Sequence, residues 1–150
     1  MPAYLRALAS RNYRIYFAGQ IVSLAGTWMQ QIAMVWLAYR LTGSALVLGT
    51  VAFASQIPIL VFSAFGGVIT DRLDRRRLLL ATQALSMVQA LLLAVLAWLD
   101  MATPAHLIVL AFGLGCINAL DVPARQAIVV QLIDDKADLA NAIALNSFMM

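Results

Sequence analysis

Charged residues are scarce in this sequence. They make up 11% of its 150 residues, whereas ordinary soluble domains contain about 25%. Apolar residues make up 63%, more than a soluble core can use. Four long stretches carry no charge when His106 is counted as neutral: 15–39, 41–70, 78–99 and 101–120. Each reaches the ~20 residues that a helix needs to cross a bilayer, so the sequence predicts an all-α membrane protein with four spanning helices.

Cysteine and histidine are almost absent. Cys116 is the single cysteine, which excludes an internal disulfide, and His106 has no second histidine or cysteine at the spacing of metal ligands. No serine and histidine share a predicted helix face, and no glycine-rich loop could hold phosphate groups. We therefore expect no enzyme activity, no catalytic residues, no metal site and no cofactor.

Positive charge is unevenly distributed between the two ends of the predicted helices. Only Arg40 lies at one end, and Arg125 is left out because its position is ambiguous. Eight residues lie at the other end: Arg6, Arg11, Arg14, Arg72, Arg75, Arg76, Arg77 and Lys136. Because cytoplasmic loops carry an excess of lysine and arginine, we predict a multi-pass protein of the plasma (inner) membrane with a cytoplasmic N-terminus. The net charge of +3 is thus a topology signal and does not point to a nucleic-acid partner.

The predicted helices have recognisable ends. Thr42-Gly43-Ser44 forms a tight turn, and Pro104 suits the first turn of a helix. The expected ranges are 15–39, 46–69, 78–99 and 105–133, with outward connections at 41–45 and 100–105. A fifth apolar run starts at 139 and reaches Met150 after twelve residues, too few to span a bilayer. The expectation is a chain truncated within a fifth helix.

Polar residues recur along one face of the first and fourth predicted helices. They follow each other at steps of three or four residues: Gln20, Ser23, Thr27 and Gln30 or Gln31 in the first, and Asn118, Asp121 and Arg125 in the fourth. Lipid cannot satisfy such groups, so these faces should point to protein or to water. For the first helix two interpretations remain open: its polar residues form hydrogen bonds between helices, or they line a cavity. Gln83, Ser86 and Gln89 in the third helix are assigned to packing.

Asp121 and Arg125 are the charged residues within the predicted spans, where each ion costs roughly 2.5 to 3.5 kcal/mol at a helix centre. Their spacing of four residues, acid first, allows them to pair along one face. Two interpretations stay open: a structural ion pair, and a role in substrate or proton handling. Asp121 is the candidate for proton coupling, because it is the acid in these helices that lies away from their ends.

Residues 67–77 join two apolar runs and contain six charges. Gly67 has no side chain, so another helix could approach its backbone closely, as happens at small residues in membrane proteins. Asp71 is placed to neutralise the positive end of a nearby helix, a contact typically worth 0.3 to 1 kcal/mol. A contact present in one transporter state only would shift the balance between two states. The alternative is a solvated basic connector that only fixes topology.

The pattern Gly67-x-x-x-Asp71-Arg72-x-Asp74-Arg75-Arg76 resembles the signature loop of the major facilitator superfamily. Glycine is most often found where this chain has Asp74, and the variant with aspartate is similar to the branch of macrolide-efflux and enterobactin-exporter proteins. Other stretches agree with this resemblance: Trp36-Leu37-x-Tyr39-x-Leu41-Thr42-Gly43-Ser44, Pro123-Ala124-Arg125-Gln126-Ala127 and Ala140-Asn141-Ala142-x-Ala144-Leu145-Asn146-Ser147. The likeness covers essentially the whole chain.

The resemblance implies a partial N-terminal six-helix half of a twelve-helix transporter, with the C-terminal half missing. In such transporters helices one and four line a central cavity, and the two halves rock against each other. The family's aspartate at the position of Asp71 stabilises the outward-facing state. A further aspartate found near the end of helix four in some members is replaced here by Gln131.

The resulting interpretation is a proton-coupled exporter of amphiphilic small molecules, such as a drug or a siderophore. Its partners would be membrane lipid, a small-molecule substrate, protons and the missing C-terminal half. The cavity and coupling candidates are Asp121, Arg125, Asn118, Gln20, Thr27 and Gln31. The alternatives are an uptake permease of the same superfamily and a small four-helix membrane scaffold or inactive fragment.

Overall fold

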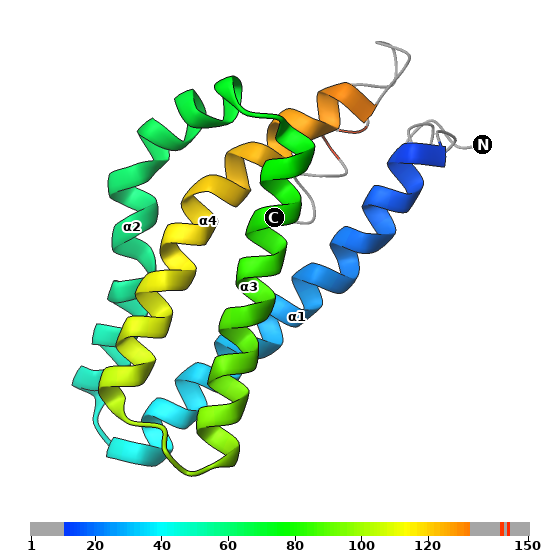
Figure 1. The fold of residues 1–150 in the computed structure, drawn as a ribbon. Coiled ribbons are helices and arrows are strands. Elements are labelled where there is room, and N and C mark those ends of the chain that lie inside the picture. Colours follow the sequence, from blue (N-terminus) through cyan, green and yellow to red (C-terminus); the bar gives the residue numbers. More distant parts are fainter. Residues whose placement is uncertain (1–10, 133–141, 143, 145–150) are drawn as a thin grey trace. The chain divides into compact units, whose positions relative to one another are not determined.

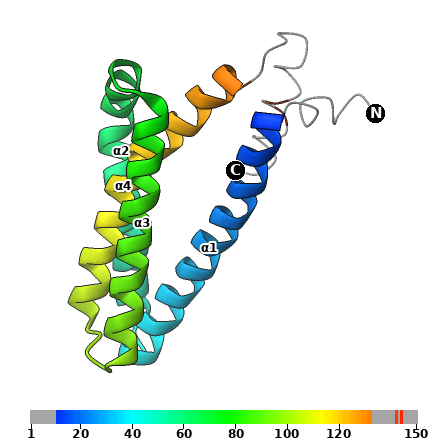
Figure 2. The same cartoon turned by 45° about the vertical axis from the view of Figure 1, so that its right-hand side comes forward.

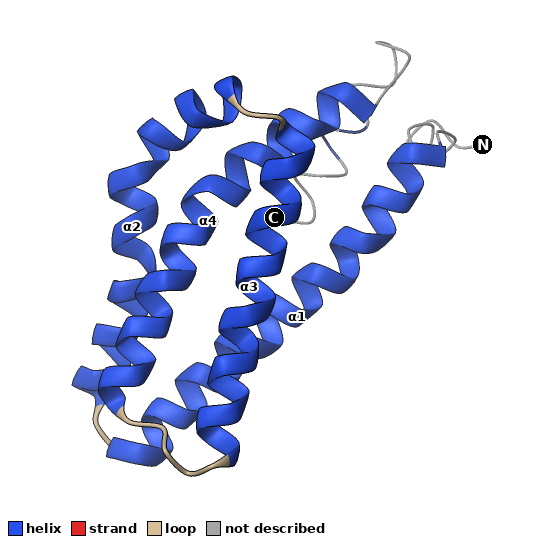
Figure 3. Cartoon of the chain, viewed as in Figure 1, coloured by secondary structure: helices blue, strands red, loops and turns tan. Residues whose placement is uncertain are grey.

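The computed structural model describes residues 11–132, 142 and 144, and the regular elements among them are all α-helices (Figure 3). They are α1 (Arg11–Thr42), α2 (Ala45–Arg72), α3 (Arg75–Trp98) and α4 (Pro104–Leu132). All four are long and apolar enough to cross a membrane. This confirms the predicted all-α membrane fold with four spanning helices. The expected start of a fifth helix at 139 lies outside the described residues, as do Arg6 and Lys136.

Four helix ends extend beyond the uncharged runs to include arginines. α1 begins at Arg11 and continues past Arg40 to Thr42, α2 ends at Arg72 and α3 begins at Arg75. Hydropathy marks the part of a helix that suits hydrocarbon, but backbone hydrogen bonding continues into the interface, where arginine is tolerated. The connector between α2 and α3 is therefore shorter than the expected gap between 69 and 78, and consists of residues 73 and 74.

Local hydrogen bonds explain where the helices end. The amide of Gly43 donates to the Tyr39 carbonyl at 2.7 Å, and Gly43 has a φ of 60°, the left-handed conformation that closes many helices. The amide of Arg77 donates to the Asp74 side chain at 3.0 Å, so Asp74 is the N-cap of α3. The hydroxyl of Thr103 accepts the amide of His106 at 3.3 Å before α4. The connections 43–44 and 99–103 are shorter than the expected 41–45 and 100–105, and their outward location stays a prediction.

The chain divides into two compact units. One comprises 1–29 and 125–150, and the other comprises 30–124. In the second unit α2, α3 and the first part of α4 lie side by side (Figures 1 and 2). The connections 43–44 and 99–103 lie at one end of this unit, and the connection 73–74 lies at the other (Figure 3). The polypeptide thus runs alternately up and down within it.

Each unit has its own buried cluster of apolar side chains. In the unit 30–124 all four helices contribute, through Met34, Leu37, Ala38, Val51, Ala54, Leu93, Leu107 and Ala111. In the other unit the cluster is formed by Tyr13, Val129 and Ala142, with Tyr16 and Phe17 packed against it. The hydroxyl of Tyr13 donates to the carbonyl of Ala142 at 3.1 Å. This hydrogen bond joins the start of α1 to the residues that follow α4.

The outer surface is strongly apolar. Large side chains such as Leu60, at 80% exposed, point away from the buried clusters, and Trp28, Trp36 and Trp98 are exposed as well. In water so much exposed apolar surface would cause association, whereas lipid chains cover it without cost. The four apolar spans and this surface identify a multi-pass membrane protein.

Candidate functional site

Asp121 on α4 is a buried carboxyl group held by α3. Its side chain is 4% exposed, and its Oδ1 accepts hydrogen bonds from the hydroxyl of Thr82 at 2.6 Å and from Nε2 of Gln83 at 3.2 Å. Thr82 is itself buried. Two neutral donors from the neighbouring helix thus meet one oxygen of an acid within the apolar part of the unit. Such partners are what a carboxyl group needs where water is absent.

Thr82 is not among the residues predicted from the sequence, and for Gln83 the sequence predicts a role in packing. Threonine is common in membrane helices and satisfies itself on its own backbone, so a single threonine is a weak signal. Its hydroxyl also lies 3.0 Å from the carbonyl oxygen of Leu79. The available hint was that Thr82 and Gln83 are adjacent polar residues in a mostly apolar run. Which α3 residues face α4 could not be read from that pair.

Arg125 lies in the other unit, where it faces the polar stripe of α1. Its Nη1 donates to Oε1 of Gln20, and its Nη2 donates to the hydroxyl of Ser23 at 3.5 Å. Nε2 of Gln20 in turn donates to the hydroxyl of Tyr16 at 3.0 Å. Arg125 and Gln20 are both buried. The structure therefore brings two of the predicted site residues together, while the ion pair between Asp121 and Arg125 stays a prediction.

Of the remaining polar residues on α1, Thr27 and Gln30 form hydrogen bonds with helices, and Gln31 lines a pocket. The hydroxyl of Thr27 donates to the carbonyl of Ser23 on its own helix at 3.0 Å. Gln30 donates to Gln89 on α3, and Gln89 donates to the carbonyl of Leu110 on α4 at 3.1 Å. For Gln89 the assignment to packing agrees with these contacts, since the buried amide links three helices.

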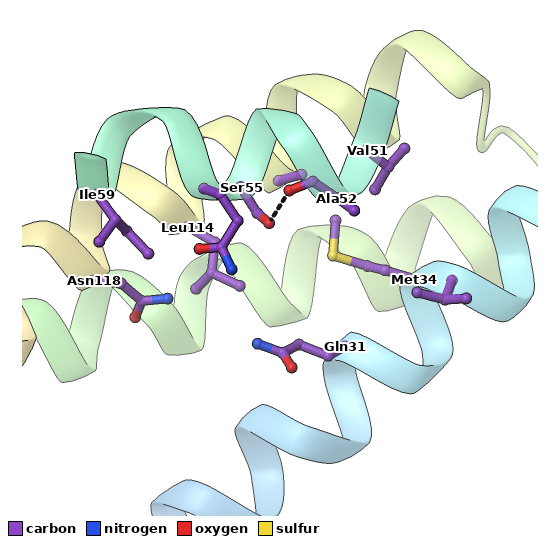
Figure 4. A pocket seen from close by; sticks show the side chains of 11 residues that line it. Gln31, Met34, Val51, Ala52, Ser55, Ile59, Leu114 and Asn118 are labelled. Atoms are coloured by element: carbon purple, nitrogen blue, oxygen red, sulfur yellow. Dashed lines mark hydrogen bonds between the residues drawn. The ribbon is translucent and has the colours of Figure 1, made fainter. Parts of the chain in front are cut away.

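A pocket of about 220 Å³ opens between α1, α2 and α4 in the unit 30–124 (Figure 4). Gln31 reaches it from α1 and Asn118 from α4, so two predicted cavity residues line one space. Ser55 and Gln56 on α2 add two polar groups that the sequence analysis missed. The other lining side chains are apolar: Met34, Val35, Val51, Ala52, Ile59, Ala111 and Leu114. The lining given by the described residues carries no charge.

One hydroxyl of this pocket is bonded locally. The Ser55 hydroxyl donates to the carbonyl of Ala52 at 2.7 Å, the dashed line in Figure 4. Its oxygen keeps free acceptor capacity, because a hydroxyl has two lone pairs and one proton. The side-chain amides of Gln31, Gln56 and Asn118 each supply a carbonyl oxygen and an NH₂ group. The pocket thus combines apolar walls with uncharged donors and acceptors.

The predicted signature residues lie mostly in helices. Gly67 belongs to α2, and within the described part of the chain a β-carbon added there would meet no atom within 4 Å. The expected close approach of another helix at Gly67 is therefore not found among these residues. Arg72 is exposed at the end of α2, and Arg75 and Arg76 belong to the first turn of α3.

Asp74 has a structural reason to differ from the glycine that is usual at this position. Its side chain caps α3, and glycine caps a helix only slightly less well than aspartate does. Asp71 precedes Arg72 in the last turn of α2, and its side chain lies outside what the structure describes, as does that of Gln131. The described residues contain no group of metal-binding side chains.

Comparison with known proteins places the chain in a family. Residues 3–150 match the family model described as transmembrane secretion effector, which belongs to the major facilitator superfamily. Among curated proteins, the staphyloferrin A transporter of Staphylococcus aureus is 32% identical over 138 residues, which is 91% of this chain and 34% of the relative. Macrolide efflux protein A of Streptococcus pyogenes is 27% identical over 130 residues, 83% of this chain and 32% of the relative.

The multidrug efflux pump Tap of Mycolicibacterium fortuitum is 37% identical over 94 residues, 61% of this chain and 23% of the relative. The chain thus spans about a third of the length of the first two relatives. No solved structure matches it significantly. All three relatives are transporters by name and none is an enzyme, in agreement with the sequence-based expectation. By its sequence and its four spanning helices, the chain belongs to the transmembrane secretion effector family of the major facilitator superfamily.

Proposed function

We propose that this chain is the N-terminal part of a proton-driven exporter of amphiphilic small molecules. Two of the relatives carry efflux in their names, for macrolides and for multiple drugs. The observation that carries the proposal beyond the family is the buried carboxyl group of Asp121, which two neutral donors of α3 hold within a membrane-spanning helix.

A carboxyl group in this position suits proton coupling. Ionised, it carries a charge at low dielectric, and protonated, it is a neutral hydrogen-bonding group. The free-energy difference between these forms depends on whether water reaches the site, so exposure to one side or the other can drive proton uptake and release. Thr82 and Gln83 supply hydrogen bonds without adding a fixed charge of their own.

The pocket of the unit 30–124 supports the substrate class. Its walls combine side chains such as Met34 and Ile59 with the uncharged polar groups of Gln31, Gln56 and Asn118. Small-molecule sites are commonly built in this way, with apolar surface for affinity and a few polar groups for orientation. A molecule with an apolar body and hydroxyl, ester or amide groups would fit this chemistry.

The proposal includes alternating access and a cytoplasmic N-terminus in the inner membrane. With a C-terminal half completing the cavity, the protein would open to each side in turn. Asp71, close to the connection 73–74 and to the arginines at the flanking ends of α2 and α3, would contribute to one of the two states through a contact with that half. The alternation of connections between the two ends of the unit is compatible with this topology.

The test is Asp121→Asn in the full-length protein that contains this chain, reconstituted in liposomes with an imposed pH gradient. Asparagine keeps the size and an oxygen that can accept from Thr82 and Gln83, but it cannot take up and release a proton. We expect gradient-driven efflux of erythromycin or ethidium to be lost while the protein still inserts in the membrane. The matched control is Asp100→Asn, an exposed aspartate in the connection 99–103, which should transport normally. Transport by Asp121→Asn at the rate of the control would remove Asp121 from the coupling mechanism.

A further inference from the structure

The hydroxyl group of Thr82 lies between two acceptors. It is 2.6 Å from Oδ1 of Asp121 on α4 and 3.0 Å from the carbonyl oxygen of Leu79, one turn earlier on its own helix. A hydroxyl has one proton to donate and two lone pairs with which to accept. At any moment Thr82 can therefore donate to only one of these two oxygens.

We propose that Thr82 is a positioning residue that holds Asp121 in both of its protonation states by turning its hydroxyl proton between Asp121 and the Leu79 carbonyl. The inference rests on the proposed function, because it presupposes that Asp121 takes up and releases a proton during transport. It goes beyond that function because it assigns the positioning of Asp121 to Thr82 on α3. A threonine in a membrane helix does not by itself indicate a function.

In the ionised state Thr82 donates its proton to Oδ1 of Asp121. A hydrogen bond to a charged acceptor is stronger than one to a neutral acceptor, so the carboxylate wins the competition with the Leu79 carbonyl. The amide of Gln83 donates to the same oxygen at 3.2 Å. Both bonds compensate for the water that this buried carboxylate has lost.

In the protonated state the bond reverses its direction. The acid has gained a proton from water on Oδ1 and donates it to the hydroxyl oxygen of Thr82. The hydroxyl turns its own proton to the Leu79 carbonyl, which is already at hydrogen-bonding distance. When Asp121 returns its proton to water, the hydroxyl turns back. Thr82 keeps its own proton throughout, and none of its covalent bonds changes.

This arrangement lets the charge change without leaving a buried polar group unpaired. Thr82 is 2% exposed and Asp121 is 4% exposed, so water would not readily replace a lost partner. An unsatisfied buried group costs more than a typical hydrogen bond contributes. Without the Thr82 hydroxyl, the acid proton would lose this acceptor, and the carboxylate would lose the donor that lies at 2.6 Å.

Two arginines lie at helical spacing from this pair in the sequence. Arg125 follows Asp121 by four residues on α4, and Arg75 precedes Thr82 by seven residues on α3, so each lies on the corresponding helix face. The other charged residues of the described helices lie near helix ends. Arginine keeps its charge throughout the physiological pH range, so the variable charge at this place belongs to Asp121.

The experiment compares Thr82→Val with Thr82→Ser in the full-length protein in liposomes. Valine has nearly the shape of threonine without the hydroxyl, and serine keeps the hydroxyl without the methyl group. The readout is the ratio of gradient-driven efflux to exchange of the same probe, erythromycin or ethidium, at equal pH on both sides. Exchange needs substrate binding and alternation but no net proton transfer, so a merely structural defect lowers both rates together.

We expect Thr82→Val to lower this ratio about tenfold and Thr82→Ser to restore it to within about twofold of the wild type. The matched control is Thr50→Val, because the hydroxyl of exposed Thr50 bonds only to the carbonyl of Leu46 on its own helix among the described contacts. If Thr82→Val is not recovered from the membrane, Thr82→Ala removes the same hydroxyl and must give the same loss. An unchanged ratio in the hydroxyl-free variant, or a loss equally large in Thr82→Ser, overturns the inference.

Asp121→Asn separates this inference from the function on which it rests. If Asp121→Asn keeps gradient-driven efflux, or if the wild type exports neither probe, the proposed function fails and the inference fails with it. If Asp121→Asn loses gradient-driven efflux while Thr82→Val keeps the wild-type ratio, the function stands and only the role of Thr82 is refuted.

Discussion

Gly115 on α4 packs against the backbone of α2 at Ser55. A β-carbon built on Gly115 would lie 2.4 Å from the Ser55 carbonyl oxygen and 3.0 Å from Cγ of Pro58. The first distance is far below any contact that real β-carbons make, and the obstructing atom belongs to a backbone that cannot turn away. Pro58 stands inside α2 and has no amide proton to donate to the preceding turn. The two helices approach this closely because Gly115 has no side chain between them.

Gly115→Ala is therefore expected to push α2 and α4 apart. Overpacking of a close contact typically costs about 1 to 3 kcal/mol, so the melting temperature and the yield of folded protein in detergent should fall. The matched control is Gly113→Ala on the same helix, where an added β-carbon would meet no atom within 4 Å among the described residues. Alanine favours a helix over glycine, so this control should be neutral or slightly stabilising. Equal melting temperatures for the two variants would contradict the close packing.

The pocket between α1, α2 and α4 should contribute to substrate affinity through Gln31 and Asn118. Replacement of either residue by alanine in the full-length protein removes an uncharged donor and acceptor, and a net hydrogen bond is worth about 0.5 to 1.5 kcal/mol. We expect the KM for erythromycin export to rise roughly twofold to tenfold while the maximal rate changes less. Gln126→Ala on the exposed face of α4 serves as the control and should leave the KM unchanged. A KM unaffected by both pocket substitutions would exclude this pocket from substrate binding.

The predicted membrane topology can be tested with reporter tags at Gly43 and Asp74. Gly43 lies in the connection between α1 and α2, and Asp74 lies in the connection between α2 and α3 at the other end of the unit 30–124 (Figure 3). The arginines beside Asp74 should keep that connection on the cytoplasmic side. Alkaline phosphatase should be active at Gly43 and inactive at Asp74, and a fluorescent protein should give the opposite result. Activity of the same reporter at both positions would contradict the topology.

Much of the fold could be predicted from the sequence because hydrocarbon imposes a simple rule. An uncharged run of sufficient length becomes a spanning helix, and α2 and α4 appear close to where they were expected. The ends of α1 and α3 were harder to place. They depend on a hydrogen bond such as that between Asp74 and the Arg77 amide, and on arginines that continue a helix into the interface.

The sequence predicts which polar residues face inward, but it does not predict which of them bond to each other. The spacing of Gln20 and Arg125 placed each on an inward face, and the structure joins them directly. The partner of Asp121 on α3 was missed, because a helical face toward α4 can be assigned only once the rotation of α3 is known. Helix rotation depends on packing contacts distant in sequence, such as the bond from Gln89 to the Leu110 carbonyl. The rotation of α3 therefore cannot be inferred from the residues of α3 alone.

The three tryptophans have a practical consequence for spectroscopy. Trp28, Trp36 and Trp98 are 59%, 57% and 87% exposed, and the guanidinium of Arg40 lies 5.2 Å from the centre of the Trp36 ring. Indole emission from this chain will therefore respond to the surrounding detergent or lipid, and brominated acyl chains should quench it. Denaturation of the buried clusters should change that signal little, so circular dichroism is the appropriate reporter.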